Sequence, residues 1–216
     1  MKKILLGTFF LSCVLGLSAQ DQKTIQLNEH TKVRGTSVME AFQNRQSIRA
    51  YETKDLSLQD LSDLLWAANG INRPAIGKKT APSAMNAQEV DIYICRADGA
   101  FLYDAATNTI KLVISQDIRP LIDGSRPSGA PVILLLASDL SKYRGYSPDS
   151  KDLKHLSEMG CLDAGIVSQN ISIFCAGAGL GTVPRAGMDQ QNIRKALNLK
   201  ESQSLWLNHP VGYPKK

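Results

Sequence analysis

The sequence predicts an α+β fold in which a central mixed or antiparallel sheet is flanked by helices, one of them long and central. Three observations support this class. Apolar segments of strand length occur at 90–95 and 131–137, with a hairpin-like segment at 99–113 between them. A longer segment, 151–178, keeps apolar residues at helical spacing. The sequence shows no internal repeat, and its 216 residues are enough for one domain with a sizeable core.

The N-terminal segment 1–19 has the pattern of a secretory signal peptide. Lys2 and Lys3 form a basic start, and the apolar stretch from Ile4 to Leu17 is too short to span a bilayer comfortably. Small residues then precede polar sequence, which predicts cleavage near Ala19. We therefore expect an exported protein, periplasmic or extracellular, with no stable transmembrane segment after processing.

A lipoprotein signal that uses Cys13 is the alternative, although the residues after Cys13 are still apolar where a lipoprotein usually turns polar. Residues 20–36 are polar and aperiodic, so we expect an irregular N-terminal arm. The folded domain is then predicted to span 37–216, because no linker or composition shift divides this range.

The charge balance is mildly basic. The formal net charge is +5, and removal of Lys2 and Lys3 leaves +3. No basic block is interleaved with aromatic residues, so nucleic-acid binding is not expected. A small anionic ligand accounts for the excess equally well.

Cysteine and histidine usage excludes other chemistries. Cys95, Cys161 and Cys175 remain after processing, an odd number that predicts free, buried thiols rather than a disulfide framework. The chain has three histidines and no HExxH or CxxC spacing, so we expect no metal site. No GxSxG elbow is present, and no side chain is assigned as a catalytic acid or base. Asp163, on the long helix, is expected to be solvated or at an interface.

Two helices are predicted early in the domain. Ser37 is a suitable N-cap for a short helix that starts with Val38–Phe42. Ser57 caps an amphipathic helix that Gly70 ends. A loop rich in Pro, Gly and Lys is expected at 71–82.

The strands follow. Val90–Cys95 is predicted to be a strand, and Gly99–Val113 a hairpin that turns near Thr107-Asn108. Pro131–Ala137 is a continuous apolar run, which predicts a strand buried on both faces. A last strand is expected around Leu205–Val211.

The longest helix is predicted from about Lys151 to Ala178, with Ser150 as its N-cap and Gly179 at its end. Its apolar residues cover more than one face, which suits a helix packed between a sheet and a partner subunit. A short helix is expected at Asp189–Leu197.

The first candidate site is Arg45, Ser47 and Arg49. In an extended segment their two-residue spacing places all three side chains on one face. Guanidinium groups bind phosphate in bidentate fashion, and a hydroxyl adds a donor. A solvated basic edge is the alternative interpretation.

The second candidate is the segment Ala81–Gln88. Pro82-Ser83 could simply start a helix, with Ser83 as its N-cap. A turn that exposes Ser83 and Asn86 would instead offer hydrogen-bonding groups to a polar ring edge.

The third candidate is Gly177–Gly187. Its first glycines do not form a dinucleotide-binding fingerprint, because they close a helix instead of opening one. Pro184 stiffens the following loop, while Ala186 and Gly187 leave their backbone amides unobstructed. Such a loop can bring N–H groups against a flat ligand.

Taken in order, these segments resemble the FMN-dependent nitroreductase family over about residues 37–214. Members carry an R-x-S-x-R/K segment, here Arg45–Arg49, then P-S-x-x-N-x-Q, here Pro82–Gln88. A long helix leads into G-L-G-x-x-P-x-x-G, here Gly179–Gly187, and a G-Y-P-like turn, here Gly212–Pro214, closes the family pattern. The order of the motifs, more than any one of them, carries the resemblance.

The resemblance implies a homodimer with FMN held at the subunit interface. Arg45 and Ser47 would hold the phosphate and ribityl end, and Arg49 would approach the pyrimidine carbonyl. The other subunit would supply Pro82, Ser83 and Asn86, whereas the loop after Pro184 would present the amides of Ala186 and Gly187 to N5 and O4 of the ring.

Two departures from the family pattern affect this site. Members often carry a further basic residue after the last strand, and here only Lys215 and Lys216 can serve. Many members also have an acidic residue where Ala186 stands.

The segment 90–113 resembles the azoline-oxidising branch of the family.

The implied activity is an FMN-dependent oxidoreductase that transfers a hydride through flavin N5 in a ping-pong scheme. A small-molecule electron donor, NAD(P)H among the possibilities, and an acceptor would share one site. The alternatives are an exported flavin-binding protein without turnover, an azoline-type dehydrogenase, and a domain that kept the fold and lost the cofactor. The sequence does not identify the substrate.

Overall fold

The computed structural model describes residues 23–215, so the predicted signal peptide and Lys216 lie outside the described residues. The main sheet has seven strands in the order β1-β6-β5-β4-β7-β9-β8, and every pairing is antiparallel. The strands are β1 (Thr24–Gln26), β4 (Val90–Arg96), β5 (Gly99–Asp104), β6 (Thr109–Ile114), β7 (Val132–Asp139), β8 (Gly181–Thr182) and β9 (Gln203–Gly212). The α+β class is confirmed, and the described sheet is antiparallel rather than mixed.

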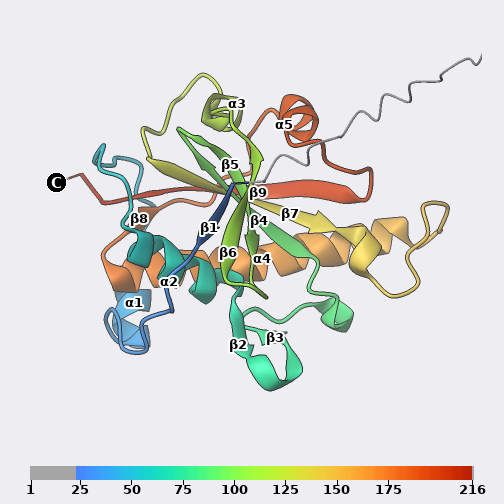
Figure 1. Ribbon diagram of the computed structural model, residues 1–216, viewed down its shortest axis with the longest axis horizontal. Helices are drawn as coiled ribbons and strands as arrows, with labels where there is room; N and C mark the ends of the chain where they lie inside the picture. The colour runs from blue at the N-terminus through green and yellow to red at the C-terminus, as the bar shows by residue number, and fades with distance from the viewer. Residues whose placement is uncertain (1–22, 216) are drawn as a thin grey trace, which may run out of the picture.

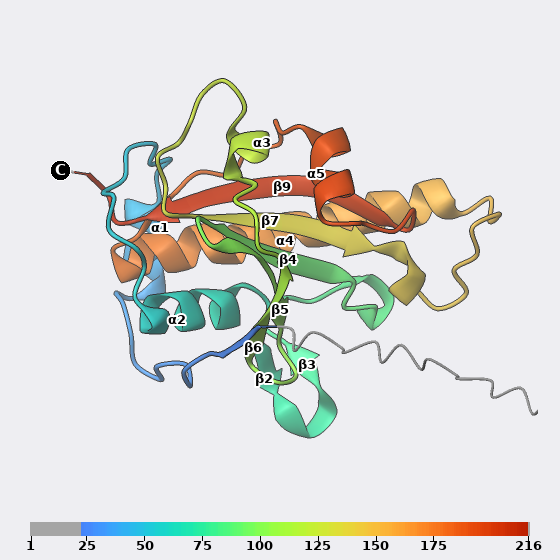
Figure 2. The same ribbon diagram turned by 45° about the horizontal axis from the view of Figure 1, so that its top comes forward.

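Helices cover both faces of this sheet (Figures 1 and 2). The long helix α4 crosses one face together with α2 and α1, and α3 and α5 lie on the other face. Their bounds are α1 (Val38–Asn44), α2 (Leu58–Asn69), α3 (Arg119–Asp123), α4 (Leu153–Ala178) and α5 (Gln190–Ala196). Short 3-10 turns are η1 (Pro74–Ile76), η2 (Ala84–Asn86) and η3 (Leu140–Lys142).

The central strand β7 is buried along its whole length, as its continuous apolar run predicts. Alternate side chains enter different cores because successive residues of a strand point to opposite faces. Leu134 and Leu136 pack in the core beneath α2 and α4, while Ile133 and Leu135 pack in the core beneath α3 and α5.

The predicted helix ends are confirmed at α1 and α2 and shifted at α4. The hydroxyls of Ser37 and Ser57 accept hydrogen bonds from the third residue of α1 and α2, respectively. The N-cap of α4 is Asp152 rather than Ser150, whose hydroxyl accepts from the amide of Asp152 instead. Gly179 ends α4 in the left-handed conformation, as expected.

The N-terminal arm is more ordered than predicted. Residues 24–26 form β1, which pairs with β6 and is the edge strand on that side of the sheet, and Leu27 is buried. Arg34 forms ion pairs with Asp60 and Asp63 of α2, which attaches the rest of the segment. The expectation of an irregular arm is therefore wrong here, because backbone pairing with an exposed sheet edge needs no hydrophobic periodicity.

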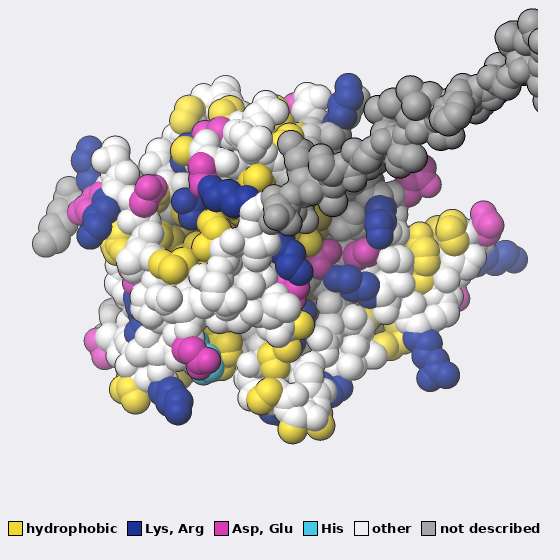
Figure 3. Space-filling model, viewed as in Figure 1, with side chains coloured by type: hydrophobic (Ala, Val, Ile, Leu, Met, Phe, Trp, Pro, Cys, Tyr) yellow, Lys and Arg dark blue, Asp and Glu magenta, His cyan; other side chains and the backbone are white. Residues whose placement is uncertain are grey.

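The predicted loop 71–82 also contains structure. It forms a small hairpin of β2 (Ile71–Arg73) and β3 (Lys78–Lys79) that extends away from the main sheet (Figure 1). Figure 3 shows hydrophobic side chains exposed at the tip of this hairpin and around α1.

The three described cysteines are free, as predicted, but only Cys95 and Cys175 are buried; Cys161 is exposed on α4. Among the described helices, only α4 is long and apolar enough to meet the length and composition of a membrane span. In this structure 44% of its most apolar window is buried inside the fold.

Candidate functional site

The arginine segment is extended and lies beside the end of β8. The amide of Ile48 donates to the carbonyl of Thr182 at 2.9 Å, and Ile48 lies so close to Gly181 that a Cβ there would come within 2.6 Å of its side chain. Because side chains alternate along an extended segment, the contact of Ile48 with the protein turns its neighbours outward. Arg45, Ser47 and Arg49 are all exposed.

The C-terminal residues run next to this segment. Tyr51 pairs with Pro214, and the amide of Lys215 donates to the carbonyl of Ala50 at 3.0 Å. The Lys215 side chain is exposed, and this hydrogen bond places the Lys215 backbone next to the residue that follows Arg49.

The loop that follows β8 is anchored to β9. Arg185 and Asn208 exchange backbone hydrogen bonds of 2.9 and 2.8 Å, and Pro184, Ala186 and Gly187 are exposed. Within residues 23–215, no hydrogen bond satisfies the amides of Ala186 and Gly187. A Cβ built on Gly187 would meet nothing within 4 Å, and a hollow of about 420 Å³ opens beside this residue. The amides of Ala186 and Gly187 are therefore unpaired donors on an exposed part of the loop.

Electrostatics connects this loop with the arginine segment. Burial raises the pKa of the Tyr51 phenol, while the charges of Arg185 and Arg49 act in the opposite direction. Both guanidiniums therefore lie within electrostatic range of one phenol. The Tyr51 hydroxyl donates to the carbonyl of Ile48 at 2.5 Å, and this contact helps to fix the segment.

The turn at Ser83–Gln88 has an unusual backbone. Met85, Asn86 and Gln88 all have positive φ, a conformation that non-glycine residues rarely adopt. The Ser83 hydroxyl accepts from the amide of Gln88 at 2.9 Å, and no side-chain cap of η2 is formed. Pro82 and Asn86 are exposed. Strain of this kind is typical of ligand-binding segments, and it argues against a simple helix start.

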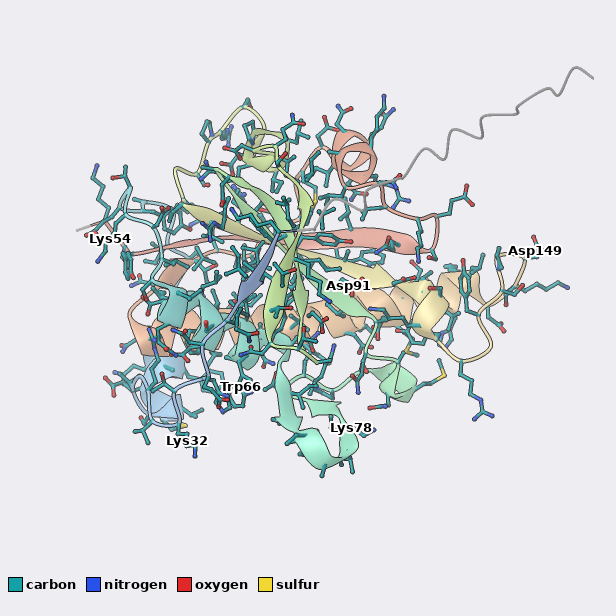
Figure 4. The ribbon with its side chains drawn as sticks, in the orientation of Figure 1. Lys32, Lys54, Trp66, Lys78, Asp91 and Asp149 are labelled. Atoms are coloured by element: carbon teal, nitrogen blue, oxygen red, sulfur yellow. The ribbon has the colours of Figure 1, made fainter. Side chains whose placement is uncertain are left out.

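The structure does not bring this turn close to the arginine segment. The amide of Ala84 donates to Asp163, near the middle of α4, whereas the amide of Thr36, just before α1, donates to the carbonyl of Gly177 at the C-terminal end of that helix. The separation along the helix is about 20 Å. Figure 4 agrees with this separation: Lys54, just after the arginine segment, lies at the left edge of the molecule, whereas Lys78, a few residues before the turn, lies at its lower centre.

A buried acidic pair supports the Ser83–Gln88 turn. Glu89 is fully buried; its Oε1 accepts from the Tyr143 hydroxyl at 3.0 Å, and its Oε2 has no partner among the described residues. Burial, and then the adjacent Asp163 carboxyl, raise the pKa of Glu89 to about 7. Protonation would allow Glu89 to donate to the adjacent Asp163 carboxylate and would satisfy this atom.

Sequence reasoning missed this pair. Asp163 is buried, which corrects the expectation of a solvated or interface residue. The available signal was Glu89 itself, a charged residue placed directly before the apolar strand β4.

The comparisons with known proteins agree with this fold. A model of the nitroreductase family matches residues 42–213. A nitroreductase-like protein of Methanocaldococcus jannaschii is 27% identical over 180 residues, which cover 78% of this chain and 86% of that protein. The crystal structure of a nitroreductase-like protein from Ralstonia eutropha JMP134 gives a TM-score of 0.81 at 27% identity and covers 89% of this chain and 90% of that chain.

A more distant structure shows the same fold. The NADPH:FMN oxidoreductase of Vibrio harveyi, solved in complex with NAD+, gives a TM-score of 0.61 at 18% identity and covers 83% of this chain and 69% of that one. This likeness concerns the fold alone. Because the family model covers most of its length, the chain belongs to the nitroreductase family of oxidoreductases.

Proposed function

We propose that the protein is an FMN-dependent oxidoreductase that works as a homodimer. The observation that carries this proposal is the pair of unsatisfied, exposed amides at Ala186 and Gly187, beside a glycine surface that a flat ring can approach. When bound, FMN would supply the redox chemistry by accepting a hydride at N5 and passing the electrons to an acceptor.

The chemistry of the nearby groups fits FMN. Arg45, Ser47 and Lys215 would hold the phosphate and ribityl end, because guanidinium and ammonium groups form charge-assisted hydrogen bonds with phosphate. Arg49 would donate to a pyrimidine carbonyl. The amides of Ala186 and Gly187 would donate to the polar ring edge. No side chain is given the role of a proton donor or base.

The distribution of the proposed site over one chain supports a homodimer. The Ser83–Gln88 turn is bonded to the middle of α4, about 20 Å along the helix from the C-terminal end, where the segment that leads into α1 is bonded. A two-fold axis across α4 would place Pro82, Ser83 and Asn86 of one subunit against Arg45 and Arg49 of the other. Large apolar side chains are exposed along this surface: Val38, Met39, Phe42, Met85, Leu162 and Ile166.

The electron donor is proposed to be a small molecule. A nicotinamide cofactor is one candidate, because the Vibrio harveyi structure that shares this fold contains NAD+. If the predicted export is correct, another reductant is the natural donor, since nicotinamide cofactors are cytoplasmic. The azoline-like segment at 90–113 makes a ring-dehydrogenating role the second proposal for the substrate.

An absorption spectrum tests the cofactor. The purified protein is incubated with FMN and desalted; retained flavin bands support the proposal, and a protein spectrum without them overturns it. Addition of NADH or NADPH under anaerobic conditions then separates an oxidoreductase, whose flavin bands bleach, from a flavin-binding protein without turnover.

A further inference from the structure

The strand β9 carries a buried amide side chain directly beneath the loop proposed to face the flavin. Asn208 is completely buried in a strand whose other buried residues are mostly apolar. Its Nδ2 donates to the carbonyls of Arg185 and Gly187, both at 3.2 Å. Its Oδ1 accepts from Nε and Nη2 of Arg185 at 2.8 and 2.6 Å. The side chain therefore uses all of its hydrogen-bonding groups on this one loop.

These contacts fix the direction of a backbone N–H, because of the geometry of the peptide bond. In a trans peptide, the carbonyl of one residue and the amide N–H of the next point in opposite directions. Asn208 holds the Arg185 carbonyl from both its backbone amide and its side chain, so the N–H of Ala186 must point away from β9. That amide is one of the two unsatisfied donors on the exposed side of the loop.

Arg185 extends this support to the other side of the loop. Its Nη2 also pairs with Asp123 of α3 at 2.8 Å, and the Asp123 carboxylate is nearly buried. The guanidinium is thus held between Asn208 and Asp123 and is directed away from the open face of the loop. The loop has no other side-chain hydrogen bonds among the described residues.

We propose that Asn208 is a positioning residue: it orients the Pro184–Gly187 loop so that the backbone amide of Ala186 presents its donor to the flavin ring. The inference rests on the proposed function, and it assigns a role to a residue that does not itself contact the ligand. The neighbouring His209 is equally buried but bonds Ser168 and Thr182, so the loop contacts are particular to Asn208.

The variant Asn208→Asp tests the donor role, because it keeps the shape and the acceptor for Arg185 while placing a carboxylate oxygen against the two carbonyls. The dissociation constant of FMN is measured by fluorescence titration, together with the absorption band shape of the saturated protein. We expect about a tenfold weaker affinity, since two hydrogen bonds are lost, and an altered band shape. If Asn208→Asp does not fold, Asn208→Ser removes the same donors without adding charge.

Leu205→Ala is the matched control, because Leu205 is buried on the same strand and its side chain has no hydrogen-bonding group to hold the loop. We expect it to lower the melting temperature but to leave FMN affinity and band shape unchanged. If Leu205→Ala weakens FMN as much as Asn208→Asp, or if Asn208→Asp binds FMN normally, the positioning role is refuted. Failure of the unmodified protein to bind FMN would instead refute the proposed function, and the inference with it.

Discussion

Replacing Glu89 by glutamine should change how the stability of the protein depends on pH. The Glu89 carboxyl is fully buried, next to Asp163 of α4 and the Tyr143 hydroxyl, with the ammonium of Lys79 as the nearby positive charge. The glutamine side chain would keep the contact with Tyr143 and would donate permanently to Asp163. The substitution therefore removes one titration with little change of shape.

The size and sign of this pH dependence follow from the difference between the pKa values of Glu89 in the folded and unfolded states. The pKa of Glu89 is about 7 in the folded protein and 4.5 as its ordinary value. Between these values the folded state holds a proton that the unfolded state has lost, so stability is fully present below pH 4.5 and is lost as the pH rises through 7. From pH 5 to pH 8 this carboxyl alone should lower the free energy of unfolding by roughly 2–3 kcal/mol.

His209 acts in the opposite direction. Burial lowers its pKa to about 3, so the unfolded state binds more protons between that value and 6.5. Its contribution to stability is fully present above 6.5 and is lost as the pH falls toward 3, which amounts to about 2 kcal/mol between pH 8 and pH 5. The two titrations nearly cancel, and the stability of the unmodified protein should change little over this range.

Urea unfolding at pH 5, 6, 7 and 8 measures these slopes. We expect the stability of Glu89→Gln to rise by about 2 kcal/mol from pH 5 to pH 8, because only the His209 titration remains. The control is Glu158→Gln, an exposed residue of α4, which should follow the unmodified protein. If Glu89→Gln and the unmodified protein show the same pH dependence, Glu89 does not hold a proton in the folded state and the shared-proton interpretation is wrong.

Three other outcomes are expected. Arg45→Ala should weaken FMN binding by about tenfold or more, through loss of a charge-assisted hydrogen bond, and full flavin retention after desalting would contradict its assignment. Gly187→Val should abolish retention without lowering the melting temperature, since its side chain meets no protein atom within 4 Å at Cβ; unchanged flavin content would exclude a ring at this surface. Intact-mass analysis of the exported protein should show an N-terminus just after Ala19, whereas a lipid-modified Cys13 would identify a lipoprotein.

The elements that could be predicted are those whose own pattern of apolar residues indicates a buried face. The continuous apolar run of β7 and the periodic stripe of α2 each require a buried environment, and both were found. β1 could not be predicted, because only Ile25 among its three residues is apolar and the strand is stabilised by backbone pairing with β6. Such pairing depends on which edge is available, and a local pattern does not contain that information.

The candidate site likewise has residues that a local pattern predicts and residues that it does not. The spacing of Arg45, Ser47 and Arg49 predicted three outward side chains, and the exposed positions agree with it. Asn208 and Glu89 gave no comparable signal. A polar residue within or beside a strand is usually interpreted as facing solvent, whereas both of these are buried against partners far away in the sequence. Only the tertiary structure shows that Asn208 holds the Pro184–Gly187 loop and that Glu89 lies beside Asp163, which holds the Ser83–Gln88 turn.

The proposed site draws on two parts of the chain that lie about 20 Å apart along α4, which has a consequence that mixed dimers can test. Arg45→Ala and Asn86→Ala should each weaken FMN binding in a pure sample, because each damages both sites of a dimer. In a dimer formed from one chain of each kind, one site receives both substitutions and the other receives none.

Refolding an equal mixture of the two variants should therefore restore about a quarter of the sites to the original affinity. The titration should show a tight phase that is absent from either variant alone, and dilution of separately folded dimers without exchange serves as the control. If mixing produces no tight phase although mixed dimers are present, Arg45 and Asn86 do not meet across an interface. The arginine segment and the Ser83–Gln88 turn would then belong to different sites, and the flavin would have to be bound within a single chain.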